Sequence, residues 1–300
     1  MSKKVCIVGG GISGLALLHY LKKKYIRRSD VDIVLLEKND YLGGTIRSLS
    51  EGGVLFETGP NGFLDSRPRT LEFIEELGLS EDLIKANQEA KIRYLSVNNT
   101  LHALPSGPKD FLTFKLLRFF QKLRVFKEFF VPKGCDSQES VYDFGKRRFG
   151  ERFAQVFLDP MVSGVYGGDA KRLNLKSVFP RIYALEEQYG SLFKALGKLR
   201  SRKTGKNCSR PNNKIMGSFG GTLSSFQGGM AQVAKALGDQ YKNHIRLGCN
   251  ITSIAESKKQ YVITTRGEVS YTVDELFICA PAYSASTMVR NINDKITRAL

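Results

Sequence analysis

The chain has 300 residues, of which 42% are apolar and 25% are charged. This composition excludes a disordered chain, and the length corresponds to about two domains. The charge is unusual, because 46 Lys and Arg residues against 29 Asp and Glu residues give a formal net charge of +17. Such a chain attracts anions, namely nucleic acid, acidic lipid headgroups or a carboxylate-rich substrate, and composition does not choose among them.

The cysteines and histidines argue against a metal site. The five cysteines are scattered and odd in number, with no C-x-x-C pair, and the three histidines lie far apart. This pattern indicates a reducing compartment and argues against both a disulfide framework and a zinc site, so we expect no metal. No uninterrupted apolar stretch of about 18 residues occurs, which argues against a spanning helix. Because Met1-Ser2-Lys3-Lys4 leads directly into an apolar strand, we expect no signal or transit peptide.

The first 37 residues predict a βαβ unit. A short buried strand covers Val5–Val8, apolar residues at helical spacing then run to about Tyr25, and a second strand covers Asp32–Leu36 and ends on Glu37. The unit is long enough for the right-handed crossover that joins parallel strands.

A glycine-rich turn joins the first strand to the helix. It reads Gly9-Gly10-Gly11-Ile12-Ser13-Gly14, which is the G-x-G-x-x-G spacing. Gly9 allows the tight turn, Gly11 lets a pyrophosphate approach the backbone, and Gly14 lets helix and strand pack closely. The helix N-terminus offers N–H groups and the positive end of its dipole to the phosphates. Glu37 is placed to accept a ribose 2′-hydroxyl, so the unit predicts a bound dinucleotide.

Weaker patterns follow along the chain. They predict an amphipathic helix over 69–85, a hairpin over 92–104, a helix ending near Leu237, and strands near 246–254, 260–265 and 274–280. Residues 194–214 hold eight basic residues and no acid, and they predict an exposed or mobile loop.

The segment 109–133 combines helical periodicity with positive charge. Apolar residues recur at steps of four and three, and seven basic residues and seven phenylalanines face only Asp110 and Glu128. Three interpretations are open, namely a packed helix, a membrane-surface helix and a nucleic-acid site. Phenylalanines flanked by Lys and Arg suit an anionic bilayer surface. No RNP, KH or helix-turn-helix pattern supports nucleic acid, so we expect no nucleic-acid partner.

Further motifs carry a resemblance to a known family. The run Gly43-Gly44-Thr45-Ile46-Arg47 resembles the second FAD signature of the amine-oxidase-like flavoproteins. Five more blocks resemble segments of the oxygen-dependent protoporphyrinogen oxidases, in the same order: FETGPN at 56–61, Arg93 with LHALP at 101–105, DPMVSGVYGGD at 159–169, SFQGGM at 225–230 and ICAPA at 278–282. The similarity runs from residue 5 to residue 285.

The resemblance implies an α/β fold. A Rossmann-like FAD-binding domain would carry an inserted α+β substrate-binding part and a helical membrane-associated part. The implied segments are 1–82 and 227–285 for the FAD-binding part, 83–226 for the inserted part, and 286–300 for the start of a further substrate-domain segment. Family members continue with another flavin-contacting glycine motif, which nothing here matches, so we expect this chain to lack that C-terminal segment.

The resemblance also implies site residues. The expected FAD contacts are Gly9, Gly10, Gly11, Ile12, Ser13, Gly14, Glu37, Lys38, Gly44, Thr45, Arg47, Gly59, Pro60, Asn61, Ile251 and Ala280. Asn61 would lie near the reacting carbon. Arg93 would hold a substrate propionate, because a planar guanidinium suits a bidentate carboxylate contact. His102 is expected to be a packed turn residue, and the sequence identifies no general base.

The implied reaction is the oxidation of protoporphyrinogen IX to protoporphyrin IX in heme biosynthesis. It removes six hydrogens in three flavin cycles, uses dioxygen and releases hydrogen peroxide. The alternatives are a coproporphyrinogen III oxidase, another amine-oxidase-like flavoprotein such as a carotenoid desaturase, or a basic membrane- or nucleic-acid-binding protein with a vestigial nucleotide fold. The family also implies a cytoplasmic protein on the inner face of a bacterial membrane, handover of product to ferrochelatase, and a homodimer.

Overall fold

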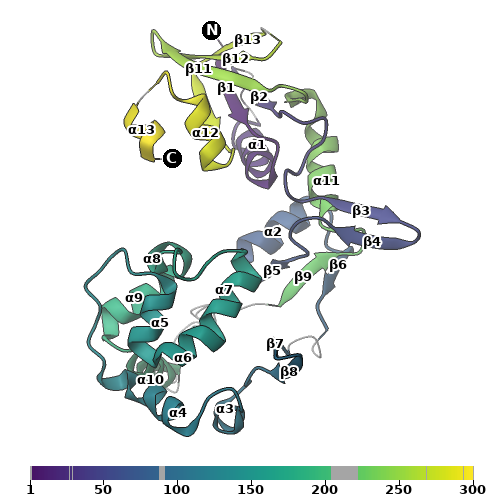
Figure 1. The fold of residues 1–300 in the computed structure, drawn as a ribbon. Helices are drawn as coiled ribbons and strands as arrows, with labels where there is room; N and C mark the ends of the chain where they lie inside the picture. Colours follow the sequence, from purple (N-terminus) through teal and green to yellow (C-terminus); the bar gives the residue numbers. More distant parts are fainter. Residues whose placement is uncertain are drawn as a thin grey trace. The chain divides into compact units, whose positions relative to one another are not determined.

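The computed structural model describes residues 2–26, 28, 30–87, 92–203, 222–267, 269–292 and 294–299. The chain divides into two compact units (Figure 1). Unit 1 is Met1–Ala86 together with Gly221–Leu300, and unit 2 is Asn87–Gly220. The sequence placed the two boundaries near 82 and 226, whereas the strands at 83–85 and 223–226 lie in unit 1, as does the described part of 286–300.

Unit 1 contains most of the strands. Its elements are β1 (Lys3–Val8), α1 (Ile12–Lys24), β2 (Val31–Leu36), β3 (Ser48–Glu51), β4 (Val54–Glu57), β5 (Phe63–Leu64), α2 (Pro68–Glu76), β6 (Leu83–Lys85), β9 (Leu223–Phe226), α11 (Ala231–Tyr241), β10 (Ile245–Arg246), β11 (Ile251–Ser257), β12 (Gln260–Thr265), β13 (Ser270–Val273), β14 (Glu275–Ile278), α12 (Ala282–Met288) and α13 (Asp294–Ala299), with a 3₁₀ turn at Lys242–His244.

The centre of unit 1 is a parallel sheet with the strand order β10-β2-β1-β14. β1 is buried on both faces, as parallel strands usually are. Val5 and Ile7 pack into the cluster that contains helices α1 and α11, while Cys6 and Val8 pack toward β11, β12 and β13. Val8 is in register with Leu36 on one side and Ile278 on the other, so three strands end at one edge of the sheet.

Smaller sheets surround this one and correct two sequence predictions. The predicted strand at 246–254 is two strands of different sheets, β10 and β11, because the chain turns at Gly248 with φ of +69°. The helix predicted over 69–85 ends at Glu76, because Gly78 has φ of +70°, and β6 then pairs with β9. A left-handed backbone favours glycine and stops a helix.

Unit 2 is mainly helical. Its elements are β7 (Tyr94–Val97), β8 (Thr100–Ala103), α3 (Pro108–Thr113), α4 (Phe119–Phe126), α5 (Val141–Phe149), α6 (Glu151–Phe153), α7 (Asp159–Tyr166), α8 (Leu175–Val178), α9 (Pro180–Tyr189) and α10 (Leu192–Lys203), with a 3₁₀ turn at Lys127–Phe130 and a π-helical turn at Ala154–Leu158. The predicted hairpin is confirmed as β7 and β8. Asn98 and Asn99 both have positive φ there, as a two-residue hairpin turn requires.

The segment 109–133 is not one helix. It forms α3, α4 and the 3₁₀ turn, and between the helices Phe114 and Leu117 are buried. Phe120 and Phe130, in contrast, are 81% and 83% exposed. The loop predicted at 194–214 begins as helix α10, and its remainder lies outside the described residues. In the described part of the chain, no helix is both long enough and apolar enough to cross a membrane.

Candidate dinucleotide-binding site

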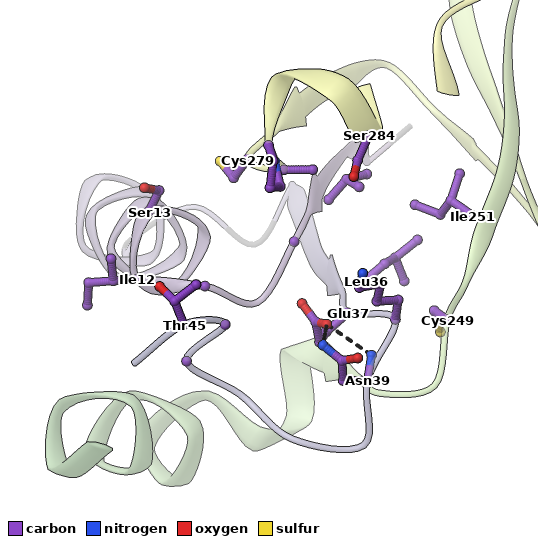
Figure 2. Close-up of a pocket in the computed structure, with 18 of the residues that line it drawn as sticks. Ile12, Ser13, Leu36, Glu37, Asn39, Thr45, Cys249, Ile251, Cys279 and Ser284 are labelled. Carbon is purple, nitrogen blue, oxygen red and sulfur yellow. Dashed lines mark hydrogen bonds between the residues drawn. The ribbon is translucent and has the colours of Figure 1, made fainter. Parts of the chain in front are cut away.

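A pocket of about 540 Å³ lies at the carboxyl edge of the central sheet (Figure 2). Its wall comes from the loops that follow three strands: Gly9 and Gly11 after β1, residues 37–39 after β2, and residues 279–281 after β14. Ligands of open parallel sheets bind in this position, because the loops from neighbouring strands separate there. We call this cavity the dinucleotide pocket.

Three glycines of the first turn shape the pocket in three ways. Gly9 has φ of +107°, and an added Cβ would lie 2.7 Å from the carbonyl oxygen of Cys279. An added Cβ at Gly14 would lie 1.9 Å from the Gly9 oxygen, so this glycine permits helix α1 to pack against the turn. At Gly11, which lines the pocket, an added Cβ would meet no atom within 4 Å. Gly11 therefore leaves open space where a ligand can approach the backbone.

The N-terminus of helix α1 faces this space. Gly11 is its N-cap residue, no side chain caps it, and its first turn holds no acid. The first N–H groups of a helix have no intrahelical partner and carry partial positive charge. Ile12 and Ser13 line the pocket at this point (Figure 2). The residues present therefore fit the pyrophosphate of a dinucleotide.

Glu37 is buried, and its carboxylate is held on both oxygens. Oε2 accepts a hydrogen bond from the Gly10 N–H at 2.5 Å. Oε1 accepts from the N–H and the Nδ2 of Asn39, at 2.9 and 2.8 Å (Figure 2). A carboxylate has about four acceptor positions, so one remains for a ribose hydroxyl. Sequence reasoning missed Asn39, although an Asn two residues after a strand-end acid is a common local partner.

The second glycine signature lies against the first. The Gly43 N–H donates to the Gly10 carbonyl at 2.9 Å, and Gly44 has φ of +61°. A Cβ added at Gly44 would lie 3.3 Å from the Gly11 Cα. This contact brings Thr45 to the pocket wall. A Cβ added at Gly59 would lie 1.9 Å from the Thr45 carbonyl oxygen. The segment 56–61 therefore packs closely against the residue that forms this part of the pocket wall.

The structure brings most of the predicted cofactor contacts together. The pocket is lined by Gly9, Gly11, Ile12, Ser13, Glu37, Lys38, Gly44, Thr45, Ile251 and Ala280. The remaining predictions lie outside its lining: Gly10, Gly14, Arg47, Gly59, Pro60 and Asn61. The Arg47 guanidinium lies over the Tyr41 ring, 4.9 Å from its centroid. Arg93 and His102 both lie in unit 2. Arg93 directly precedes strand β7, and His102 lies in strand β8.

The sequence missed several lining residues besides Asn39. They are Val8, Leu36, Tyr41, Gly43, Cys249, Cys279, Pro281, Tyr283, Ser284 and Met288. Burial raises the pKa of the Cys279 thiol, which keeps it protonated at neutral pH. The thiol therefore acts as wall and not as a nucleophile.

A hydrogen-bonded link joins two of the sequence motifs. The Glu57 carboxylate accepts from the Met230 N–H at 2.8 Å and from the Ser48 hydroxyl at 2.8 Å. The Ser48 oxygen in turn accepts from the Ala231 N–H at 3.0 Å. These groups satisfy the first N–H groups of helix α11, which has no side-chain cap of its own. The FETGPN and SFQGGM motifs thus meet at one helix end.

A parallel sheet with a glycine turn and an uncapped helix at its carboxyl edge defines a dinucleotide-binding α/β protein. The family model described as flavin containing amine oxidoreductase matches residues 12–299, and the chain belongs to this family. The match confirms the predicted flavin at the level of the family. The parallel sheet and the helices of the structure confirm the predicted α/β fold.

Curated relatives and a solved structure agree with the family. The chain is 28% identical over 301 residues to coproporphyrinogen III oxidase of Bacillus subtilis (strain 168). The aligned region covers 97% of this chain and 62% of that protein. It is 30% identical over 302 residues to chloroplastic protoporphyrinogen oxidase 1 of Spinacia oleracea, covering 98% and 53%. A crystal structure described as a "putative protoporphyrinogen oxidase" from Exiguobacterium sp. 255-15 superposes with a TM-score of 0.75 at 23% identity, covering 99% and 64%. The predicted resemblance is confirmed, and the chain spans little more than half the length of these curated relatives.

Proposed function

We propose that this chain forms the flavin-binding part, and some of the substrate-binding part, of an FAD- and oxygen-dependent oxidase of protoporphyrinogen IX. One observation carries the proposal. The open space at Gly11, beside the uncapped N-terminus of helix α1, fits a dinucleotide pyrophosphate in a chain of the flavin-containing amine oxidoreductase family. Names of relatives support the substrate class, since they are protoporphyrinogen and coproporphyrinogen III oxidases.

Bound FAD would supply the two-electron oxidant. The protein's own groups would bind and orient. The N–H groups at the start of helix α1 would hold the pyrophosphate, Glu37 would accept a ribose hydroxyl, and the Gly44-Thr45 turn would flank the chain of the cofactor. Asn61 would stand near the reacting carbon, and Arg93 would hold a propionate of the substrate.

A second substrate has specific support. The Bacillus relative, which aligns with 97% of this chain, is named for coproporphyrinogen III. Coproporphyrinogen III carries four propionates where protoporphyrinogen IX carries two. The more numerous carboxylates would need more cations than Arg93 alone, so the ratio of turnover on the two substrates distinguishes the two proposals.

The experiment starts from the purified 300-residue chain. Its visible absorption is recorded with and without added FAD, and porphyrin fluorescence then follows the oxidation of each porphyrinogen in air. We expect a stoichiometric flavin spectrum and faster oxidation of protoporphyrinogen IX. A chain that holds FAD and oxidises coproporphyrinogen III faster would reverse the substrate assignment. A colourless chain that does not respond to FAD would remove the oxidase proposal for this chain.

We also propose that the segment 119–130 of unit 2 contacts a membrane surface. Five of its phenylalanines are at least 44% exposed, namely Phe119, Phe120, Phe126, Phe129 and Phe130. Basic residues stand among them, including Lys122 and Lys127. Exposed aromatic rings among cations suit an anionic bilayer better than water. The proposed location is the inner face of a bacterial membrane, on the cytoplasmic side. Ferrochelatase handover and a homodimer stay predictions.

The double variant Phe119→Ser, Phe120→Ser tests the membrane surface. We expect its affinity for vesicles of phosphatidylglycerol and phosphatidylcholine, measured by co-sedimentation, to fall by at least about tenfold. The reason is that the variant has lost two aromatic rings whose transfer from water to the bilayer stabilises binding. Leu101→Ser, also in unit 2 and 69% exposed, is the matched control and should bind as the wild type does. Equal binding by all three proteins would contradict the proposed surface.

A further inference from the structure

A second cavity of about 320 Å³ lies in unit 1. Its walls are the amino-terminal halves of β1 and β2, the residues before and within β10, and strand β13. None of its lining residues lines the dinucleotide pocket. The oxidase proposal therefore leaves this cavity without a role. We call it the β13 cavity.

The strand register places charged side chains in this cavity. Cys6, Val8 and Leu36 pack toward β11, β12 and β13. Side chains alternate between the two faces of a strand, so Lys4 and Asp32, which are partners in register, share that face. Arg246 is in register with Leu36 and belongs to the same face. The sheet thus collects these charges opposite strand β13.

The balance of charge in the cavity is positive. Lys4 and Arg246 line it, and Asp32 is the single acid among its lining residues. In the described part of the chain, neither Lys4 nor Arg246 has an ion-pair partner within 4 Å. The nearby Asp274 carboxylate accepts from the Lys4 main-chain N–H at 2.8 Å and from Gln260 at 2.7 Å. The cations of the cavity therefore keep charge and donors for a ligand.

Main-chain oxygens hold two of the lining side chains in position. Nη1 of Arg246 donates to the carbonyls of Asn243 and Ile245 at 3.1 and 3.0 Å. The Nδ1 of His244 donates to the Ile33 carbonyl at 3.1 Å. The guanidinium keeps further N–H groups in its planar fork, which matches the geometry of an oxyanion. Tyr271 of strand β13, whose side chain packs on the same side as Cys6 and Val8, adds a neutral hydroxyl donor.

We propose that the β13 cavity binds a small tetrahedral oxyanion, either inorganic phosphate or the phosphate of a phosphomonoester. Arg246 and Lys4 are its principal cations. The hydroxyl of Tyr271 completes the donor set. A positively charged concave wall with convergent donors favours an anion over an apolar ligand.

Main-chain hydrogen bonds connect the lining of the β13 cavity to the lining of the dinucleotide pocket. The carbonyl of Arg246 accepts from the Glu37 N–H at 2.9 Å, and the Cys249 N–H donates to the Glu37 carbonyl at 2.8 Å. An anion on Arg246 will therefore change the affinity of the dinucleotide pocket, and by linkage the dinucleotide will change the affinity for the anion by the same factor. This consequence rests on the proposed FAD site.

Isothermal titration calorimetry with inorganic phosphate tests the cavity directly. The full chain, Arg246→Met, Lys4→Met and the control Lys235→Met, an exposed lysine of helix α11, are titrated at equal ionic strength. We expect one site, weakened about tenfold in Arg246→Met and less in Lys4→Met, because charge-assisted hydrogen bonds are lost. Lys235→Met removes the same charge and should bind as the wild type does. Circular dichroism melting verifies that each variant folds.

The outcomes separate the cavity from the other proposals. Tighter binding of glycerol 2-phosphate than of phosphate at the same site identifies a phosphomonoester. Equal affinity in all four proteins overturns the cavity, as does binding that is lost in Gly11→Val and retained in Arg246→Met. An FAD titration at saturating phosphate tests the linkage, and unchanged FAD affinity overturns it. Failure of FAD to bind at all counts against the oxidase proposal and leaves the phosphate titration valid.

Discussion

Replacing Gly11 with valine is expected to weaken FAD binding strongly while the fold persists. Gly11 has φ of −70° and ψ of 176°, an extended backbone that valine adopts readily. Its added Cβ meets no atom of the chain within 4 Å, and the side chain takes up space at the lining of the dinucleotide pocket. We expect FAD affinity to fall by about ten- to a hundredfold, because side-chain atoms forced into occupied space typically cost about 1–3 kcal/mol. The free energy of unfolding should change by no more than about 1 kcal/mol. Quenching of flavin fluorescence and thermal melting measure the two quantities.

Gly14→Ala is the contrasting variant. Its added Cβ would lie 1.9 Å from the Gly9 carbonyl oxygen, so helix α1 must move away from the turn. The loss of FAD affinity should therefore accompany a lower melting temperature. If Gly11→Val binds FAD like the wild type, the open space at Gly11 is not where the pyrophosphate lies.

Local signals in the sequence were enough to predict the core of the site. The order of strand, glycine turn, helix and strand is encoded within 37 neighbouring residues, and each residue type has a single physical reason there. Gly9, Gly11 and Glu37 accordingly lie at the pocket. The hairpin at Asn98-Asn99 was predictable for the same reason, since two residues with positive φ define its turn.

Contacts between distant segments were not predictable from these signals. Cys279 and Tyr283 reach the pocket because β14 pairs with β1, across more than 260 residues of chain. Glu57 and Met230 are separated in the sequence by the whole of unit 2, and they meet because the chain returns to unit 1 after it. Periodicity also misled at 109–133, where buried Phe114 and Leu117 interrupt the helix that the exposed residues suggest. A hydrophobic period reports a face but not where the chain must turn inward.

Replacing Arg148 with methionine is expected to lower the stability of unit 2 by about 3–5 kcal/mol, the usual cost of leaving a buried partner charge uncompensated. Arg148 is fully buried and donates to Glu128 at 2.9 Å and to Glu186 through Nε at 2.9 Å and also through Nη2. It also donates to the carbonyls of Val131 and Gly190, at 3.1 and 2.8 Å. Guanidinium chloride unfolding, followed by circular dichroism, measures the loss.

The same cluster predicts a dependence of stability on pH. Burial raises the pKa of Glu186, but hydrogen bonds from Arg147 and Arg148 outweigh it, so the pKa lies below its ordinary value. A carboxyl whose pKa is lower in the folded state stabilises the fold above its unfolded pKa, about 4.3. This contribution is lost as the pH falls from that value through the folded pKa. Glu186→Gln should therefore lose less stability than the wild type between pH 5 and about pH 3, which acid titration of the unfolding midpoint measures.

Two further variants distinguish the buried charge from general effects of substitution. Arg69→Met removes an exposed arginine that lies 4.0 Å from Glu72, and it should change stability little. Arg148→Lys keeps the positive charge but lacks the planar fork that reaches two carboxylates at once, so it should fall between the wild type and Arg148→Met. If Arg148→Met does not fold, the lysine variant still reports the loss. Equal stability of Arg148→Met and Arg69→Met would mean that the cluster around Arg148 does not hold unit 2 together.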